Sequence, residues 1–389
     1  MNIFYDANKI YEAGTKAIKS APFKYQSQLF EVNHLLLTAE LQRDIKEWKY
    51  KPTKGSKFTI NERGKIRNIT TNDMIDKTVN HLICDNVLTP AITPYLVYDN
   101  GASQKNKGVS FHRKRLEVHL HQYYRKHKSN EGYILLIDFS KYYASIPHNL
   151  CLENLQGFLK KVNKEEAHIT LWILKNVFDV FNAENKNGRG VDIGSQPSQN
   201  IGIAYPSRID NYIKIVKGIK YYGRYTDDMY LIHESKEYLK EVLEGIRKIA
   251  NELGLIINEK KTHIVKLSQQ FKILQIKYHL TETGRIIRKI NPKAITRERR
   301  KLKAYKRLLD KNILTYKEIE NIFKSWMSGN YKNMSMQQIT NMTQLYYNLL
   351  YSKLFNFKIY DNMLYNNFKY NRNLKILINY FILIKRFYK

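Results

Sequence analysis

Cysteine and long apolar segments are scarce in this chain of 389 residues. Only Cys84 and Cys151 are present, without a paired spacing, which argues against a disulfide framework or a zinc site and favours a reducing cytoplasm. No run of about 18 apolar residues is available to span a bilayer. Residues 1–6 lack the basic and apolar regions of a secretory signal. We therefore expect a cytoplasmic protein with no membrane partner.

Acidic side chains are scarce as well. The sequence has 35 Asp and Glu against 66 Lys and Arg, which gives a formal net charge of +31. This balance predicts a polyanionic partner, because lysine and arginine contacts to phosphates dominate nonspecific binding to nucleic acid. Heavy use of Lys, Asn, Ile and Tyr also indicates an AT-rich coding sequence, which accounts for part of the charge. The length allows a large core or two to three subdomains.

The first part of the chain predicts helices followed by a β-hairpin. Apolar residues recur at helical steps within residues 6–48, namely Leu29, Val32, Leu36, Leu41, Ile45 and Trp48. Residues 57–60 and 65–69 then favour two strands joined by a tight turn. Lys65 and Arg67 are two apart, so on a strand they share one face and can hold a triphosphate or a nucleic-acid backbone. Two solvated surface charges are the alternative.

Basic residues gather in two further segments. After a helix expected at residues 73–90, a basic helix at 112–127 contains Arg113 and Arg115. The stretch 285–303 is densely basic and includes Arg297, Arg299 and Arg300. These five arginines are candidates for contact with a nucleic-acid backbone, and an ordinary solvated face is the alternative.

Three aspartates stand at the ends of apolar strands. Residues 133–137 form an apolar run that fits a buried strand and ends at Asp138. Asp227 and Asp228 lie at the tip of a second strand–turn–strand pattern. An antiparallel sheet can bring these tips together, and adjacent carboxylates are unfavourable unless a cation lies between them. Three carboxylates can then hold two divalent cations about 4 Å apart for phosphoryl transfer. The alternative for an Asp pair alone is a turn exposed to solvent.

In order and spacing, these motifs resemble those of reverse transcriptases, and the resemblance covers most of residues 55–335. The segments that carry it are Lys65-x-Arg67 with the Asp73 helix, Ile137–Tyr143, Gly194–Gln199 in the form G-x-x-x-S-Q, Tyr225–Asp228 in the form YxDD, Leu253–Leu255 with Asn258 and Lys261, Ile273–Ile276, and Ser325–Gly329. Leu274-Gln275 stands where a Leu-Gly pair is common. The short Ser-Gln form without added domains is most similar to prokaryotic enzymes of the antiphage-defence and abortive-infection type, with retron and diversity-generating enzymes close by.

The resemblance implies an α+β, right-hand polymerase fold. It places an N-terminal helical extension at residues 1–54 and fingers at 55–132. A palm with an antiparallel sheet follows at 133–283, and a helical thumb with a basic C-terminal tail at 284–389. The tail is expected to pack on the body as a basic amphipathic helix, with contact to RNA or membrane as the alternative.

The resemblance also implies a role for each candidate residue. Asp138, Asp227 and Asp228 would be catalytic and would bind two Mg²⁺ ions, with Mn²⁺ as a substitute. The remaining candidates would bind nucleotide: Lys65 and Arg67 at the triphosphate, Tyr143 as the ring that blocks a ribose 2′-hydroxyl, Ser198 and Gln199 at the nascent pair and template, and Lys261 at the leaving pyrophosphate. An ordinary core tyrosine and a solvated lysine are the alternatives for Tyr143 and Lys261.

These features together predict an RNA-directed DNA polymerase that acts in antiphage defence on a dedicated noncoding RNA, with dNTPs as substrates and DNA as product. Synthesis without a template, or priming from a protein hydroxyl, stays open because the chain has 30 tyrosines. A diversity-generating or retron-type enzyme and a catalytically silent RNA-binding module are further alternatives. A protein partner from the same operon and a homo-oligomer are also open.

Overall fold

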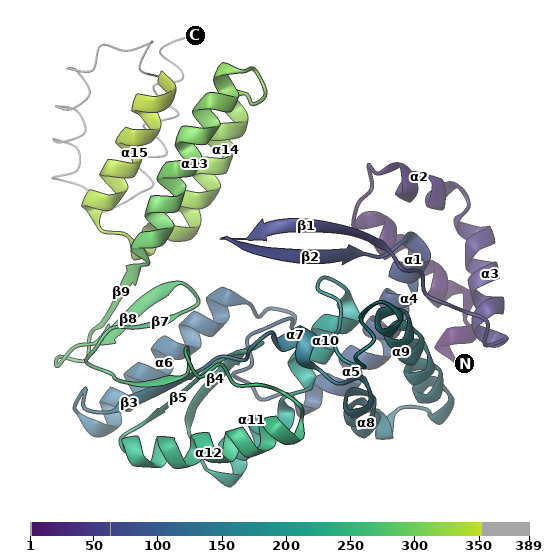
Figure 1. Cartoon of the computed structure of the whole chain (residues 1–389), viewed down its shortest axis with the longest axis horizontal. Coiled ribbons are helices and arrows are strands. Elements are labelled where there is room, and N and C mark those ends of the chain that lie inside the picture. The colour runs from purple at the N-terminus through teal and green to yellow at the C-terminus, as the bar shows by residue number, and fades with distance from the viewer. Residues whose placement is uncertain (1, 63, 352–389) are drawn as a thin grey trace. The chain divides into compact units, whose positions relative to one another are not determined.

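The computed structural model describes residues 2–62 and 64–351, which form mixed helical and antiparallel-sheet structure (Figure 1). The predicted α+β class is therefore confirmed. The chain divides into two compact units, one of residues 1–274 with 278–287 and one of residues 275–277 with the chain from 288 onward. None of the described helices is long and apolar enough to cross a bilayer. The expected basic tail, residues 355–389, lies outside the described residues.

The N-terminal region is helical, as predicted, but it forms three helices with different buried faces. They are α1 (Ala7–Lys19), α2 (Tyr25–Val32) and α3 (His34–Lys46). Leu41 and Ile45 are buried in α3 as expected, whereas Val32 is 84% exposed and Leu36 is 60% exposed. The break at Asn33 resets the helical phase, so an apolar stripe drawn through both helices does not stay on one face. In α2 the buried residues are instead Ser27 and Phe30.

The predicted hairpin and the helix after it are both present. Strands β1 (Ser56–Glu62) and β2 (Lys65–Thr71) pair antiparallel, with Ile60 opposite Arg67. Asp73 then caps α4 (Met74–Ile83), because its Oδ1 accepts from the Asp76 amide at 2.8 Å. Next come α5 (Thr89–Ile92) and the basic helix α6 (Val109–His127).

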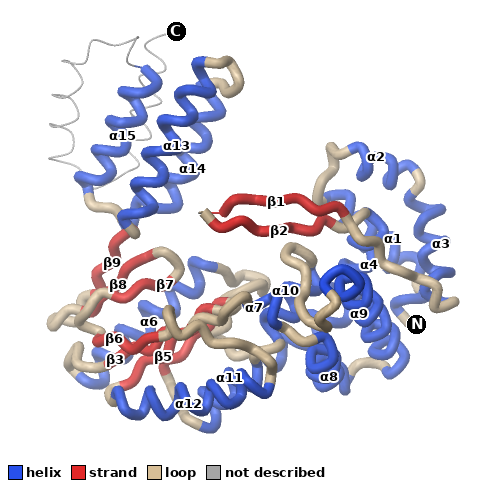
Figure 2. Tube along the Cα trace, in the orientation of Figure 1, coloured by secondary structure: helices blue, strands red, loops and turns tan. Residues whose placement is uncertain are grey.

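The centre of the first unit is a four-stranded antiparallel sheet in the order β4-β5-β3-β6 (Figure 2). Its strands are β3 (Tyr133–Ile137), β4 (Tyr221–Tyr225), β5 (Asp228–His233) and β6 (His263–Lys266). Between β3 and β4 the chain forms α7 (Tyr142–Ser145), α8 (His148–Phe158), α9 (Lys164–Asn185), α10 (Gln196–Ala204) and α11 (Ser207–Asn211). Four of the five residues of β3 are buried, which explains its nearly unbroken apolar sequence.

Helix α12 (Lys236–Glu252) lies along this sheet (Figure 1). Its buried residues Leu239, Val242, Leu243 and Ile246 follow the 3.6-residue period. Burying side chains of this size stabilises the fold by about 1.5–3 kcal/mol each. The helix ends before Gly254, whose φ of +67° suits glycine. This packing fixes the sheet whose strand ends carry the three aspartates.

The second unit contains a bundle of three helices with its own core: α13 (Pro292–Asp310), α14 (Tyr316–Asn330) and α15 (Met336–Tyr351). The sequence pattern of residues 297–354 predicts helical structure with a break near Trp326 and Gly329. The breaks lie instead at residues 311–315 and 331–335, and Gly329 lies inside α14. A capping box explains the first restart, since the hydroxyl of Thr315 caps the Glu318 amide while the Glu318 carboxylate accepts from the amide of Thr315.

A three-stranded sheet has the order β7-β8-β9, and its strands are β7 (Phe271–Ile273), β8 (Ile276–Leu280) and β9 (Ile286–Ile290). Leu274 and Gln275 form a two-residue connection from β7 to β8, with φ values of +43° and +72°. Tight hairpin turns with positive φ at both central positions favour Asn and Gly, because other side chains crowd the backbone there. The connection between β7 and β8 therefore has the conformation that favours glycine, although Leu274 and Gln275 occupy it.

We expect Gln275→Gly to stabilise the protein by about 0.5–1 kcal/mol, since glycine adopts this positive φ without a steric cost. The measurement is the melting temperature in a thermal-shift assay. Gln344→Gly in the middle of α15 is the control, and we expect it to destabilise the protein because glycine weakens a helix interior. A lower melting temperature for Gln275→Gly would contradict the expected relief.

Candidate functional site

Strand pairing brings Asp138 and Asp228 together. Ile137, the last residue of β3, pairs with Met229 in β5. Continuing this antiparallel register by one residue sets Asp138 opposite Asp228. Side chains that face each other across two strands have Cβ atoms about 4.5–5.5 Å apart, and like charges there are destabilising. The register alone therefore creates an acidic pair at one end of the sheet.

Asp227 is delivered by the turn between β4 and β5. Tyr225 pairs with Asp228, so Thr226 and Asp227 are the two turn residues. Thr226 has a φ of +56°, which is unusual for a β-branched residue. Such backbone strain costs about 1–3 kcal/mol and persists where surrounding contacts fix the conformation. The tip that carries the aspartates is thus held in an unfavourable conformation by its surroundings.

The aspartates influence one another electrostatically. Burial raises the pKa of Asp227, and the charge of Asp138 raises it further. The pKa of Asp228 is raised to about 7, by burial first and then by the charges of Asp227 and Asp138. Lys261 lowers both pKa values, and Arg67 also lowers that of Asp227. The hairpin residue Arg67 is therefore close enough to act on this site.

Asp138 has two side-chain donors on one of its oxygens. Asn258 Nδ2 donates to Asp138 Oδ2 at 3.0 Å, and Lys261 Nζ donates to the same atom at 2.7 Å. The Asn258 amide also donates to the Asp138 carbonyl at 2.8 Å, so the backbones are joined as well. The structure thus brings Lys261 to the carboxylates. The sequence predicts no separate role for Asn258, which belongs to the same motif as Lys261.

The site fits divalent cations through its donor chemistry. The carboxylates are oxygen acceptors, burial and then the neighbouring carboxylates raise the pKa values of Asp227 and Asp228, and a hard cation relieves that repulsion. Among the described residues, no group of three His, Cys, Asp or Glu side chains is arranged so that it could hold a metal ion by itself. Magnesium sites of this kind use one or two carboxylates and take further ligands from substrate phosphates, so an open donor set is compatible with the prediction.

Tyr143 lies beside the aspartates on α7. Burial, and next the charge of Asp227, raise the pKa of its hydroxyl to about 12. Its backbone carbonyl accepts from the Val191 amide at 3.0 Å. A Cβ added at Gly202 would lie 2.7 Å from the Tyr143 hydroxyl oxygen, so the ring lies directly against α10. The ring thus occupies the space between α10 and the Asp227 turn.

Ser198 and Gln199, both predicted to contact the substrate strands, differ in their exposure to solvent. Ser198 is buried, and its hydroxyl donates to Asp192 Oδ1. Asp192 also accepts from the Ser195 hydroxyl at 2.8 Å, so one carboxylate organises the start of α10. Gln199 is exposed on the same helix. Ser198 therefore serves an internal network in this structure, and Gln199 is the residue of the pair that faces solvent.

The predicted basic residues lie in different settings. Arg113 donates to the Leu274 carbonyl, and Arg115 Nε donates to Asp99 Oδ1 at 2.5 Å. Both arginines of α6 thus have partners within the protein, whereas Arg299 and Arg300 are exposed on α13 and Arg297 is partly exposed there. The side chain of Lys65 lies outside the part of the chain that the structure describes.

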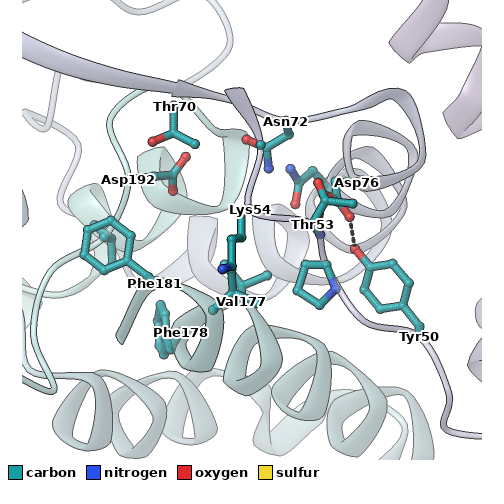
Figure 3. A pocket seen from close by; sticks show the side chains of 15 residues that line it. Tyr50, Thr53, Lys54, Thr70, Asn72, Asp76, Val177, Phe178, Phe181 and Asp192 are labelled. Carbon is teal, nitrogen blue, oxygen red and sulfur yellow. Dashed lines mark hydrogen bonds between the residues drawn. The ribbon is translucent and has the colours of Figure 1, made fainter. Parts of the chain in front are cut away.

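A small pocket that is open to solvent lies where the hairpin base meets α9 and the segment before α10 (Figure 3). Asp76 fixes one wall, since it accepts from the Tyr50 hydroxyl at 2.7 Å and from the Thr53 amide at 2.9 Å. Asp192, which organises α10, lies in the opposite wall beside Thr70 in Figure 3. The pocket thus joins the base of β1–β2 to the start of α10.

We expect Asp228→Asn to raise the melting temperature in EDTA by about 2–4 °C at pH 8 and by less at pH 5. The pKa of Asp228 is about 7 in the folded protein, against about 4 in an unfolded chain. Ionising Asp228 therefore costs stability as pH rises from about 4, and the full cost is present above about 7. Asparagine carries no charge at either pH and removes this cost.

The control is Asp179→Asn, which changes an aspartate whose side chain is 59% exposed on α9. Added Mg²⁺ should raise the melting temperature of the unchanged protein more than that of the Asp228 variant, because binding stabilises only the state with the full donor set. An equal shift at both pH values would contradict the assigned electrostatic cause.

One comparison with known proteins identifies a family for this chain. The family model described as reverse transcriptase (RNA-dependent DNA polymerase) matches residues 51–278. No match was found among curated proteins.

Solved structures that resemble this chain include telomerases of two Candida species. Apo telomerase from Candida tropicalis is 14% identical, with a TM-score of 0.49 over 77% of this chain and 63% of that chain. Its form truncated from the C-terminal domain is 14% identical, with a TM-score of 0.46 over 60% of this chain and 54% of that one. The Candida albicans telomerase in complex with a fragment of telomeric RNA is 13% identical, with a TM-score of 0.45 over 76% of this chain and 59% of that chain. The chain thus spans less than two thirds of each.

The family match covers more than half of the chain, from just before the β1–β2 hairpin to β8. It contains the three aspartates, Tyr143 and the start of α10 in one continuous segment. The right-hand polymerase fold expected from the motifs is the fold of this family. The chain therefore belongs to the reverse transcriptase (RNA-dependent DNA polymerase) family.

Proposed function

We propose that this protein is an RNA-directed DNA polymerase that uses Asp138, Asp227 and Asp228 to hold two Mg²⁺ ions. The observation that carries the proposal is the acidic cluster at the strand ends, where Asp227 and Asp228 have raised pKa values partly because Asp138 is close. When bound, the two ions activate the attacking 3′-hydroxyl and neutralise the leaving pyrophosphate. Mn²⁺ would fit the same oxygen donors.

Positioned residues around the aspartates would supply the rest of the chemistry. Lys261 lies 2.7 Å from Asp138 Oδ2, and we propose that it neutralises or protonates the pyrophosphate as it leaves. Lys65 and Arg67 on the hairpin would bind the triphosphate, and Arg67 already acts on the pKa of Asp227. Phosphoryl transfer needs mainly positioning and charge neutralisation, which these groups provide.

Residues of α10 and of the basic helices are each proposed to contact nucleic acid. Exposed Gln199 is proposed to contact the template strand, and Ser198 to act through Asp192 on the start of α10. Exposed arginines of α13 would contact the nucleic-acid backbone. For Arg113 and Arg115, phosphate contact would require exchange of the present partners Leu274 and Asp99. dNTPs are the proposed substrates and DNA the product.

We further propose a role in antiphage defence with a dedicated noncoding RNA as template, in the cytoplasm. This rests on the resemblance of the short Ser-Gln motif to prokaryotic defence enzymes and on the net charge of +31, which suits an RNA partner. A second protein from the same operon and a homo-oligomer belong to the same proposal.

The test is primer extension by the purified protein on matched RNA and DNA templates, together with sequencing of nucleic acids that copurify with it. We expect template-dependent DNA synthesis with Mg²⁺ and one enriched RNA species. A product unrelated to any template, or one that is lost on protease treatment, would replace this proposal by untemplated or protein-primed synthesis. RNA binding without synthesis would indicate a catalytically silent RNA-binding module.

A further inference from the structure

An arginine is buried inside the central sheet, directly before the aspartate motif. Arg224 lies in β4 and is 0% exposed, and it is among the largest fully buried side chains of the described residues. Its counter-charge Asp210, on α11, is 1% exposed. Charged residues are almost never buried this fully unless they are paired. The sequence shows an arginine at this position but gives no reason to expect that its side chain is buried.

The guanidinium of Arg224 has a partner on every side. Arg224 Nε donates to Asp210 Oδ1 at 2.8 Å, and Nη2 donates to Asp210 Oδ2 at 2.5 Å. Tyr222, also in β4, donates its hydroxyl proton to Asp210 Oδ1. This two-point pairing locks the plane of the guanidinium, because the rigid fork of arginine matches the carboxylate. Asp210 therefore sets the direction of the remaining donors.

Those remaining donors reach two parts of the candidate active site. Nη2 also donates to the Ile203 carbonyl of α10 at 2.8 Å. Nη1 donates to the Thr226 carbonyl at 3.2 Å. Ile203 follows Gly202, which lies against Tyr143, and Thr226 precedes Asp227. One charged group thus connects the helix behind the Tyr143 ring with the turn that delivers the aspartate.

Stability alone does not account for this arrangement. Well-packed apolar residues commonly replace a buried ion pair without loss of stability, because the pair must give up its hydration. The Thr226 peptide, in contrast, has a φ of +56° that a β-branched residue adopts only when contacts impose it. The Thr226 side chain also forms a hydrogen bond with Tyr143, but the bond from Arg224 is made to the Thr226 carbonyl itself.

We propose that Arg224, oriented by Asp210, is a positioning residue that fixes the Thr226 peptide and thereby aims the Asp227 carboxylate at the metal. This inference rests on the proposed polymerase function and deepens it. Arg224 itself touches no reacting atom, and it acts through the turn.

The test is Arg224→Lys, which keeps the positive charge beside Asp210 but loses the fork that reaches Thr226. We expect kcat for primer extension to fall about 10- to 100-fold, while KM for dNTP changes less than about twofold. Mn²⁺ binding to the metal-free protein, measured by electron paramagnetic resonance without substrate, should weaken about 10-fold. Unchanged kcat and unchanged Mn²⁺ affinity in a folded variant would overturn the proposal.

Two further variants separate positioning from folding. Arg224→Lys combined with Thr226→Gly should recover part of the Mn²⁺ affinity, because glycine adopts the positive φ without help. Arg208→Lys is the control, since Arg208 pairs with Glu252 on the surface at 2.6 Å, away from the turn. Its kcat and Mn²⁺ affinity should not change. If Thr226→Gly recovers no Mn²⁺ affinity, Arg224 does not act through the Thr226 peptide and the proposal fails.

Should Arg224→Lys unfold at the assay temperature, the apolar double variant Arg224→Met with Asp210→Leu replaces it. We expect this protein to fold, since the charges leave together, yet to bind Mn²⁺ weakly and extend primers slowly. A folded double variant with normal Mn²⁺ affinity would refute the positioning role. If the unchanged protein binds Mn²⁺ but polymerises nothing, the proposed function fails while the binding measurements still decide this inference.

Discussion

Replacing Asp227 with asparagine is expected to lower the rate of primer extension by about 10³-fold or more. The substitution keeps the size of the side chain and removes the charge that a catalytic cation requires. Asp227 is delivered by a two-residue turn beside Asp138, and its pKa is raised by burial first and then by the charge of Asp138. RNA binding should be largely kept, because it depends on lysine and arginine contacts elsewhere. The measurement is single-turnover extension at saturating dNTP, with RNA affinity measured in parallel.

The matched control is Asp179→Asn, which makes the same chemical change at an exposed ion pair on α9. It should extend primers at the unchanged rate. Substantial synthesis by the Asp227 variant would show that the metal assignment is wrong. Loss of both synthesis and RNA binding would point instead to damage of the fold, which a melting temperature measured on the same sample would reveal.

Replacing Tyr143 with alanine is expected to reduce the preference for dNTP over NTP by about 10- to 200-fold, the range that one steric contact in a pocket provides. Burial and the charge of Asp227 raise the pKa of Tyr143 to about 12, which places its hydroxyl beside the aspartate as a neutral group. A neutral ring excludes a 2′-hydroxyl by its volume. The measurement is kcat/KM for each nucleotide on one primer–template.

Gly202→Ala tests the same ring from its other side. A methyl group there would lie 2.7 Å from the Tyr143 hydroxyl oxygen and 2.9 Å from its Cε1 atom, so the ring or the helix has to move. We expect an altered ratio of dNTP to NTP incorporation with Tyr143 still present. If neither variant changes that ratio, Tyr143 is an ordinary core tyrosine and the nucleotide preference has another source.

The predicted strands and caps followed from local patterns. The strand at residues 133–137, the acidic hairpin tip and the helix that begins after Asp73 all formed where the sequence indicated. Each depends on neighbours a few residues apart, through side-chain alternation or through a cap reaching the next turn. The family resemblance used the same local segments, which explains why the aspartates were found without a structure.

Other features depended on residues far apart in the chain and were not predictable locally. Val32 and Leu36 matched a helical stripe in the sequence, but the break at Asn33 turned them outward. Arg113 seemed free to contact phosphate, yet it donates to the Leu274 carbonyl, 161 residues away. A basic side chain looks the same in sequence whether its partner is a phosphate or a distant carbonyl.

The sequence by itself determined that three carboxylates end two apolar strand segments, since alternation and turn chemistry are local properties. Only the tertiary structure decided that Asp138 stands opposite Asp228, because that depends on the register of β3 against β5. It also decided that a buried Arg224 connects Asp210 with the strained Thr226 peptide. Burial is the physical reason for this effect. Away from water, the charge of Arg224 needs hydrogen-bond partners for all its donors, and so it fixes the position of the groups that accept them.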